Sequence, residues 1–514
     1  MPFHGTASSD PMKKNSLFPA ALAAVALSGC ASDPAVGPTS ATAPTTVAAR
    51  PNILLIVSED HGPELGCYGD PFVRTPILDR LAADGMRFDR AYVTQAGCSP
   101  SRASIHTGLY PSQNGQIALA TWGFLMYSED TPNIPRSLKA AGYRTGIIGK
   151  LHINPAEAFP FDFAEIPRGN FARRDLPDYA RFARRFMRRG EEPFFLVVNY
   201  PDAHSPWQRQ VDGLPPEPLN PEDIEPLPYF GVDTPQLREI LANHYNSIMR
   251  LDTLVGDLLA QLDASGKADN TIVLFVSDHG PDLIRGKRTV YEGGVHVPFI
   301  VRWPGQVVPG SVSKDLVSMV DLFPTFLELS GADAVDGLPG RSLLPVLTGE
   351  SSDWRSYLYT EFHAHGGGKN LNPQRALRDE RFKLIHNLIP GVVNPAYVDN
   401  MEEFDSVPAA AAAAPPHVRA TYERIRVPPP FELYDLREDP NEFFNLADDP
   451  AHAAVLARMQ AALLEYRRSI RDPLLDPAIL ERFRNEVGPM TNRQRAREHR
   501  WRYPEYFFPD RQGR

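Results

Sequence analysis

Four short runs of almost uninterrupted apolar residues limit most strongly how this chain can fold. They span residues 52–57, 194–198, 272–276 and 299–301. Runs of this length without polar alternation are typical of strands that are buried on both faces. Between them, apolar residues recur with helical spacing, most clearly from Ile240 to Leu262. Strands that alternate with helices predict an α/β fold, in which a large, mixed but mostly parallel sheet is flanked by helices.

The pattern changes in the last third of the chain. Residues 381–385 and 431–435 have the composition of short strands, and an alanine-rich stretch lies between them at 408–416. We expect that stretch to be a surface insertion. The chain then divides into an N-terminal domain over residues 51–350 and a smaller C-terminal α+β domain with a short antiparallel sheet over residues 351–514.

Residues 1–30 predict a lipoprotein signal peptide rather than a buried alanine-rich helix. A lysine pair precedes an apolar run over residues 17–27, which is too short to span a bilayer and ends in Leu-Ser-Gly-Cys at Cys30. This ending resembles a bacterial lipobox, which implies that Cys30 is lipidated. Residues 31–50 are rich in Ala, Pro, Thr and Ser and are expected to form a flexible tether. We expect an exported protein in the bacterial cell envelope (periplasm or outer membrane), in contact with the membrane only through its lipid anchor.

The charge of the chain argues against one class of protein, and its cysteine content excludes another. The chain has 53 Lys and Arg against 63 Asp and Glu, a net charge of −10, which does not favour binding to nucleic acid. Its three cysteines exclude a disulfide scaffold.

Two arginine-rich stretches, 181–189 and 493–502, are open to two interpretations: attraction of a polyanionic glycan, or ordinary solvated surface.

Acidic residues directly follow two of the predicted strands. Glu59 and Asp60 come after the first, and Asp278 and His279 come after the third. The carboxyl ends of parallel strands meet at one edge of a sheet, so these residues are expected to converge. Like charges held together need a cation, although each acid alone is also compatible with a helix cap. The two pairs together favour a metal site.

A third motif, Cys98-Ser99-Pro100-Ser101-Arg102, identifies a family. Cys-x-Pro-Ser-Arg resembles the signature of the type I sulfatases, in which a formylglycine-generating maturation enzyme converts the cysteine to 3-oxoalanine (formylglycine). Further stretches that resemble family landmarks follow in order at residues 142–152, 286–298, 340–345 and 433–440. The resemblance spans residues 51 to about 470. It implies an alkaline-phosphatase-like sulfatase fold whose N-terminal domain is catalytic.

The resemblance implies a catalytic set of Cys98, Arg102, Lys150, His152, His204 and Lys287. Formylglycine at position 98 would be hydrated, and one of its hydroxyls would attack sulfur while the arginine steadies it. The two lysines would bind the sulfuryl oxygens and supply positive charge where negative charge develops. His204 would protonate the leaving group, and His152 would help the second hydroxyl to expel sulfate and restore the aldehyde.

The resemblance also implies a divalent cation held by Glu59, Asp60, Cys98, Asp278 and His279. The family usually has Asp-Asp where this chain has Glu59-Asp60, and Asp-Asn where it has Asp278-His279. Calcium prefers oxygen ligands, whereas imidazole suits softer transition metals. We expect Ca2+, with Mn2+ as the alternative. Asp-His pairs also occur in related phosphonate and phosphodiester hydrolases.

Within the family, several stretches resemble the heparan N-sulfatases (sulfamidases): residues 144–150, 160–164, 193–196, 228–235 and 384–388. This implies a sulfated saccharide substrate, with cleavage of the N–S bond of N-sulfated glucosamine in heparan-type glycans. Asp202, His363, His365 and Arg375 are expected either to contact the sugar or to be ordinary polar loop residues. The alternatives are an O-sulfatase for another sulfated sugar, a phosphonate or phosphodiester hydrolase, and a catalytically inactive surface lipoprotein that binds glycans.

Overall fold

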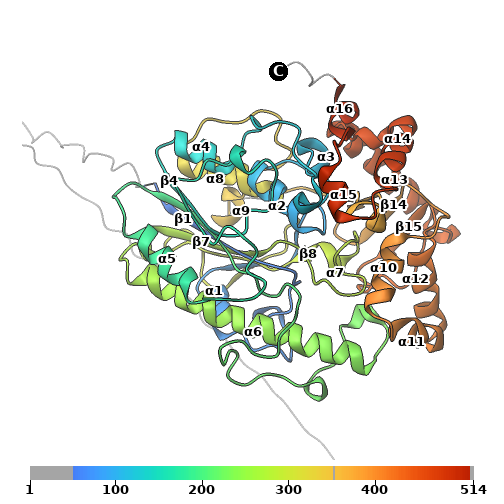
Figure 1. The fold of residues 1–514 in the computed structure, drawn as a ribbon, viewed down its shortest axis with the longest axis horizontal. Helices are drawn as coiled ribbons and strands as arrows, with labels where there is room; N and C mark the ends of the chain where they lie inside the picture. Colours follow the sequence, from blue (N-terminus) through green and yellow to red (C-terminus); the bar gives the residue numbers. More distant parts are fainter. Residues whose placement is uncertain (1–49, 351–353, 510–514) are drawn as a thin grey trace, which may run out of the picture. The chain divides into compact units, whose positions relative to one another are not determined.

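A mixed eight-stranded sheet lies at the centre of the N-terminal part of the chain (Figure 1). The computed structural model describes residues 50–350 and 354–509, so the predicted signal peptide, Cys30 and nearly all of the tether lie outside the described residues. In spatial order the strands are β10 (Ser311–Ser313), β2 (Met86–Phe88), β9 (Phe299–Arg302), β7 (Thr271–Ser277), β1 (Asn52–Ser58), β6 (Phe194–Asn199), β4 (Arg144–Gly149) and β5 (Phe163–Glu165). Strands β7, β1, β6, β4 and β5 are parallel, and β9 is antiparallel to both β7 and β2. The expected mixed, mostly parallel sheet is confirmed.

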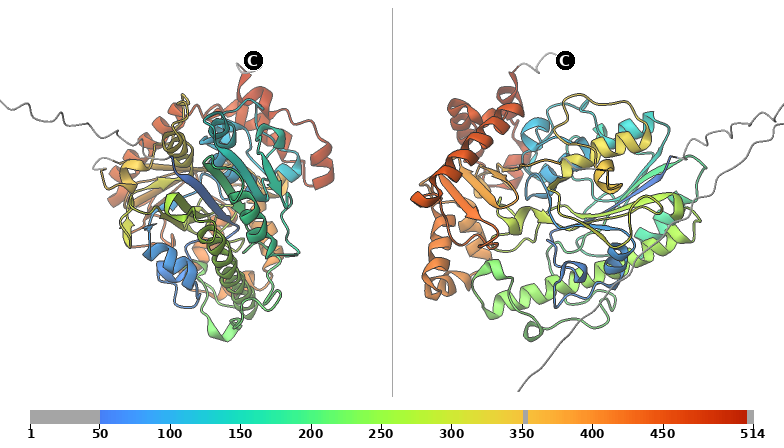
Figure 2. Two further views of the ribbon diagram at one scale, coloured as in Figure 1. Left: turned by 90° about the vertical axis from the view of Figure 1, so that its left-hand side faces the viewer. Right: turned by 180° about the vertical axis from the view of Figure 1, so that it is seen from behind.

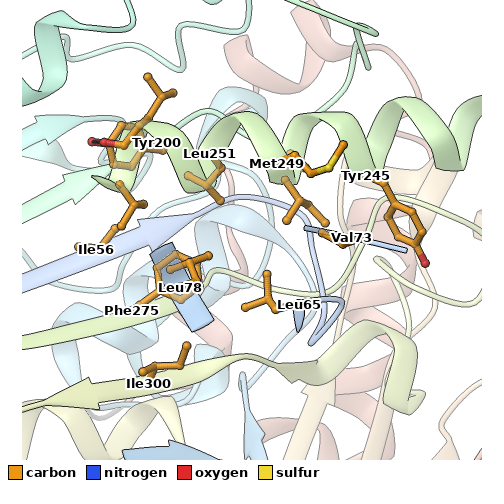
Figure 3. Close-up of a cluster of buried hydrophobic side chains, with 14 of the residues drawn as sticks. Ile56, Leu65, Val73, Leu78, Tyr200, Tyr245, Met249, Leu251, Phe275 and Ile300 are labelled. Atoms are coloured by element: carbon orange, nitrogen blue, oxygen red, sulfur yellow. Dashed lines mark hydrogen bonds between the residues drawn. The ribbon is translucent and has the colours of Figure 1, made fainter. Parts of the chain in front are cut away.

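Helices cover both faces of this sheet because its central strands are apolar on both sides. Every residue of β1 is buried, and successive side chains point to opposite faces. Leu54 and Ile56 pack in one hydrophobic cluster with α1 (Pro76–Ala83), α5 (Asp178–Met187) and α6 (Pro235–Asp263). Figure 2 shows α6 lying along this face in two further views, and Figure 3 shows side chains of the cluster between the strands and this helix.

The opposite face carries a second cluster. Ile53, Leu55 and Val57 of β1 pack there with apolar side chains of α2 (Cys98–Thr107), α4 (Ile134–Ala140) and α8 (Leu322–Ser330). In Figure 1 these helices lie across the sheet from α1, α5 and α6. The two clusters hold the sheet between helical layers, which fixes the strand ends that carry the polar motifs.

The long helix α6 begins earlier than its apolar spacing predicts. The expected helix starts at Ile240, whereas α6 starts at Pro235. The Thr234 side chain accepts a hydrogen bond from the Leu237 backbone N–H at 3.1 Å, and Pro235 occupies the first helical position. Capping threonine and first-turn proline are both typical of helix starts, so capping chemistry rather than apolar spacing sets this boundary.

A second, antiparallel sheet follows in the C-terminal part of the chain, as expected. Its strands are β12 (Leu358–Phe362), β13 (Gln374–Arg378), β14 (Phe382–Asn387) and β15 (Phe431–Asp435), paired in that order. Helix α13 (Ala453–Ser469) packs on this sheet, with Met459 and Leu463 against Leu377 and Leu384. A small third sheet joins β11 (Val317–Ser318), β3 (Ala91–Tyr92) and β8 (His296–Val297).

The remaining α-helices of the described ranges are short. They are α3 (Pro111–Asn114), α7 (Glu292–Val295), α9 (Leu344–Leu347), α10 (Pro395–Glu403), α11 (Val407–Ala413), α12 (Pro416–Arg426), α14 (Pro477–Val487), α15 (Arg493–Glu498) and α16 (Tyr503–Phe507). Throughout residues 50–350 and 354–509, no helix combines the length and the apolar character that a membrane crossing requires.

The alanine-rich stretch is mostly exposed, in agreement with the expected surface position, but one side of its helix packs against the core. It forms α11, followed by α12, and Val407 and Ala411 are buried in the same hydrophobic cluster as α6. The Tyr422 hydroxyl of α12 donates a hydrogen bond to the Phe230 carbonyl at 2.9 Å. Alanine suits both exposed and buried helix positions, so composition alone does not distinguish the two cases.

Candidate active site

The carboxyl ends of four neighbouring strands meet at one edge of the large sheet. Ser58 at the end of β1 pairs with Ser277 at the end of β7. Asn199 at the end of β6 pairs with Val57 of β1 and with Gly149 at the end of β4. The residues that follow these strands therefore lie together: Glu59, Asp60, Lys150, the loop 200–206, Asp278 and His279.

Cys98 lies at the start of α2 and faces this edge. Its Sγ is 3.4 Å from His279 Nε2 and 3.9 Å from Asp60 Oδ1, and the side chain is buried. Burial raises the pKa of the Cys98 thiol, but the positive charges of Lys150 and Lys287 more than offset this and hold it well below its ordinary value. The position therefore favours a negatively charged group.

Three carboxylates and an imidazole surround Cys98. Glu59, Asp60, Asp278 and His279 are all 0% exposed. Two overlapping groups of side chains could each hold a metal ion, because the ligand atoms within each group all lie within 4.8 Å of one another. One group is Asp60, Cys98, Asp278 and His279, and the other is Glu59, Asp60, Cys98 and His204. Glu59 Oε1 is buried without a hydrogen-bond partner. These carboxylate, thiol and imidazole groups fit a divalent cation. His204, which was not among the predicted ligands, is also close enough to be one.

Two buried lysines approach the same carboxylates. Lys150 Nζ is 2.7 Å from Glu59 Oε2, and Lys287 Nζ is 2.8 Å from Asp60 Oδ2. Burial raises the pKa of Glu59 despite the opposing charge of Lys150. Both ammonium groups are held in place by the acids, as a preorganised anion-binding site requires.

Arg102 joins the motif on α2 to four strand ends. Its Nε donates to Asp278 Oδ2 at 3.0 Å, and its Nη1 donates to Asn199 Oδ1 at 2.6 Å and to the Lys150 carbonyl at 3.1 Å. Its Nη2 lies 3.3 Å from Glu59 Oε1. These partners fix the guanidinium group in one orientation beside the cysteine. The motif alone contains no signal for Asn199, which sequence analysis missed.

The two predicted catalytic histidines have different surroundings. His204 Nδ1 lies 2.6 Å from the Ser205 carbonyl, and its Nε2 lies 3.9 Å from Asp60 Oδ2. Burial lowers the pKa of His204, but the charges of Asp60 and Glu59 and a hydrogen bond with Cys98 together outweigh it, so the pKa is raised. Burial, supported by the charge of Lys150, lowers the pKa of His152 to about 4. At neutral pH the geometry thus places a neutral imidazole and a more basic one at the same site.

Asp202 does not occupy the predicted sugar-contacting position. It is fully buried, and its Oδ1 lies 2.6 Å from both Arg173 Nε and Arg250 Nη2, while its Oδ2 accepts from Arg250 Nε at 2.7 Å. Both carboxylate oxygens are therefore used inside the protein. The side chain anchors the loop that carries His204, which corrects the expected role.

Arg375 and His363 are also internal residues rather than sugar contacts. Arg375 makes two hydrogen bonds of 2.8 Å to the carboxylate of Asp472, and its Nη2 lies 3.1 Å from His363 Nε2. The other ring nitrogen of His363 lies 3.1 Å from Gln95 Oε1. All of these partners lie within the protein, and Arg375 and His363 are 0% exposed. A charged residue in a loop or strand looks the same in sequence whether its partner is a substrate or a buried acid.

His365 lies at the site, in contrast to the other three predicted contacts. A Cβ atom placed on Gly97 would lie 3.3 Å from its Nδ1, and this nitrogen is buried without a hydrogen-bond partner. Burial and the charge of Lys287 hold the pKa of His365 well below its ordinary value. A sugar contact by His365 stays a prediction.

Asp282 is an acid beside Lys287 that was not among the predicted site residues. Asp282 Oδ2 lies 3.3 Å from Lys287 Nζ, and its Oδ1 accepts from Arg288. Lys287 and Arg288 hold the pKa of Asp282 below its ordinary value although burial raises it. The sequence signal that could have identified Asp282 is the many charged residues between positions 278 and 288.

Both arginine-rich stretches contain ion pairs with acids; in the second, Arg500 and Arg502 pair with Glu505. On α5, Arg181 pairs with Asp178, and Arg185 pairs with Glu165, which is the pattern of a solvated face. Near the end of the chain, α15 has exposed arginines, and Arg493 Nε lies 3.4 Å from the Thr121 carbonyl. The second stretch keeps both of its interpretations.

The chain resembles known proteins over most of its length. The sulfatase family model matches residues 51–332, and a model described as N-sulphoglucosamine sulphohydrolase, C-terminal, matches residues 283–392. The chain is 31% identical to N-sulphoglucosamine sulphohydrolase of Homo sapiens over 490 residues, which cover 86% of this chain and 96% of that protein.

Solved structures share the fold. A protein described in complex with its substrate D-glucosamine-2-N,6-O-disulfate has a TM-score of 0.63 at 21% identity, over 82% of this chain and 98% of that chain. The phosphonate monoester hydrolase of Agrobacterium radiobacter has a TM-score of 0.62 at 22% identity, over 82% of this chain and 96% of that chain.

Proposed function

Because the chain belongs to the sulfatase family and has the sulfatase fold, we propose that it hydrolyses the N–S bond of N-sulfated glucosamine in heparan-type glycans. The class of enzyme, a sulfatase, follows from the family. The observation that carries the finer proposal is the match to the human sulphohydrolase, which extends through both the catalytic and the C-terminal regions. An O-sulfatase or a phosphonate hydrolase would use the same fold.

We infer that a maturation enzyme converts Cys98 to formylglycine, whose hydrated form supplies the nucleophilic hydroxyl. The residues that would hold a divalent cation are Glu59, Asp60, position 98, Asp278 and His279. When bound, a cation of this kind stabilises charge on the sulfate oxygens and makes the hydroxyl more acidic. The carboxylate oxygens favour Ca2+, and the imidazole leaves Mn2+ as the second choice.

The remaining residues of the site bind and orient the sulfate group. Lys150 and Lys287 are buried, and each is held within 3 Å of a carboxylate, so their ammonium groups do not need to reorganise when an anion enters. Arg102 is fixed by Asp278 and Asn199 and keeps a positive charge beside position 98. Together they provide a cationic pocket for the sulfuryl oxygens.

Proton transfer to the leaving group is assigned to His204. A sulfamate has an amine leaving group, which needs a proton as the N–S bond breaks. The Ser205 carbonyl accepts from Nδ1–H of His204, and this hydrogen bond directs Nε2 towards Asp60 and the site. His152 is buried, and its lowered pKa keeps it neutral, so it is suited to accept a proton at neutral pH.

The proposal is tested by sulfate release from protein matured with a co-expressed formylglycine-generating enzyme. Glucosamine N-sulfate and N-acetylglucosamine 6-sulfate are compared as substrates. Cys98→Ala should abolish release, whereas Cys67→Ala, at the other described cysteine, should leave it intact. Release from the N-sulfate alone supports the proposal. Release from the 6-sulfate alone would show an O-sulfatase instead of a sulfamidase. Activity on phosphonate esters alone would show a phosphonate hydrolase.

We also propose that the protein is exported and lipid-anchored through Cys30. The support is the order of lysines, apolar run and Leu-Ser-Gly-Cys in residues 1–30. Fatty-acid labelling of wild type and of Cys30→Ser in a bacterial host tests it. Label in the wild type alone, with Cys30→Ser lost from the membrane fraction, is the expected result. Equal membrane association of the two would refute the anchor.

A further inference from the structure

One aromatic ring touches two of the predicted catalytic side chains. Phe171 lies in the connection between β5 and α5, and its ring stacks on the His204 imidazole with centroids 3.9 Å apart and planes 15° apart. Lys150 Nζ lies 4.9 Å from the centroid of the same ring. His204 follows β6 and Lys150 follows β4, so Phe171 joins side chains from two strand ends.

The backbone around this ring is held by a single buried arginine. Arg173 Nη1 donates to the Phe171 carbonyl at 2.7 Å, and its Nη2 donates to the His204 carbonyl. Its Nε donates to Asp202 Oδ1 at 2.6 Å, and Asp202 is paired in turn with Arg250 of α6. Arg173 thus ties the backbones of both stacked residues to the body of the domain.

The position of Phe171 is not explained by the hydrophobic core. Its ring is half-buried, and it belongs to none of the hydrophobic clusters of residues 50–350 and 354–509. A Cβ atom on Gly169 would lie 2.5 Å from the ring, so glycine leaves the space that the ring occupies. The local sequence therefore accommodates a ring whose contacts are with the site.

We propose that Phe171 is a positioning residue for His204 and Lys150. This inference rests on the proposed roles of those two residues. The stacked ring covers one face of the imidazole and opposes its rotation, while Nδ1 is fixed by the Ser205 carbonyl, so that Nε2 remains directed at the leaving group. The same ring contacts the Lys150 ammonium through a cation–π interaction, and Glu59 Oε2 lies 2.7 Å from that ammonium.

The test compares Phe171→Leu and Phe171→Tyr with Phe182→Leu. Phe182 is a half-buried ring on α5 with Arg181 and Arg185 beside it, so it is a matched loss of an aromatic ring away from the site. Phe171→Leu should lower kcat about ten- to a hundredfold with a much smaller change in KM, because geometry and not ground-state binding is lost. Phe171→Tyr should retain most of the activity, and Phe182→Leu all of it.

A second readout does not depend on turnover. In protein with labelled histidine, the ring protons of His204 should show an upfield ring-current shift that is lost in Phe171→Leu and kept in Phe171→Tyr and Phe182→Leu. Unchanged His204 resonances in Phe171→Leu, or a kcat within about twofold of wild type, would overturn the inference. If wild type cleaves an O-sulfate instead of the N-sulfate, the substrate proposal fails, and the same comparison of variants is made on the O-sulfate.

Discussion

Asp472 offers a direct test of the corrected role of Arg375. Its carboxylate makes two hydrogen bonds of 2.8 Å to Arg375 and accepts from Arg467 Nε at 2.6 Å. It also accepts from the Leu474 backbone N–H at 3.0 Å, as a cap. Asp472→Asn keeps the shape and one acceptor but removes the negative charge. Two buried guanidinium groups then lose their shared counter-charge.

The expected loss of stability is large for a single substitution. Removing one partner of a buried ion pair costs about 3–5 kcal/mol, because the other charge stays buried without compensation. Unfolding entropy of about 2.1 cal/mol/K per residue gives about 1 kcal/mol/K for roughly 460 described residues. The melting temperature should therefore fall by about 3–5 °C.

The loss should depend on pH in one direction. Burial raises the pKa of Asp472, but Arg375 and Arg467 outweigh it and hold the pKa well below the ordinary range. A carboxylate whose pKa is lowered by folding contributes stability above its unfolded pKa, about 4, and the contribution is lost as pH falls towards the folded value. The difference between wild type and Asp472→Asn should thus be full at pH 7 and shrink below about pH 4.

The measurement is thermal unfolding at several pH values, with Asp476→Asn as the control. Asp476 caps its own turn through the Ala478 N–H in the same way, but it is exposed. A fall below about 1 °C, or one equal to that of Asp476→Asn, would refute the reasoning. So would a difference that does not change with pH. KM for the sulfated sugar should be unchanged, whereas a raised KM at an unchanged melting temperature would restore Arg375 as a sugar contact.

Three further outcomes are expected. Lys287→Gln should lower kcat/KM by about 10²–10³, measured as sulfate release, because a preorganised cation is lost, while Lys314→Gln on the surface should not. Chelation of divalent cations should lower both activity and melting temperature, with Ca2+ or Mn2+ restoring them, and no effect on either would refute the metal site. Burial, with the charge of Asp70, raises the pKa of Glu64 to about 8, so ionisation destabilises the fold as pH rises. The melting temperature of Glu64→Gln should therefore be higher than that of wild type at pH 9 and similar to it at pH 5. Equal melting temperatures of the two proteins at both pH values would contradict this.

Local patterns were sufficient for four of the eight strands of the large sheet and for the central residues of the site. Apolar runs predicted β1, β6, β7 and β9, and the residues that follow the parallel strands meet because such strands share one carboxyl edge. The motif at Cys98 identified the family, and the structure brings it beside Asp60 and Asp278. These inferences depend only on residues that are close together in the sequence and on the parallel direction of the strands, and the sequence pattern indicates both.

The sequence pattern does not show which polar residues face the site and which pair inside the protein. Asp202 meets Arg173 across 29 positions, and Arg375 meets Asp472 across 97. Phe171, absent from the predicted site, stacks on His204 from another loop. A charged or aromatic side chain has the same identity whether it is exposed to substrate or buried against a partner, and its partner is set by how distant segments pack. Patterns in the sequence identified half of the strands of the large sheet, the family and the residues around Cys98, whereas the packing of distant segments set which side chains hold these residues in place.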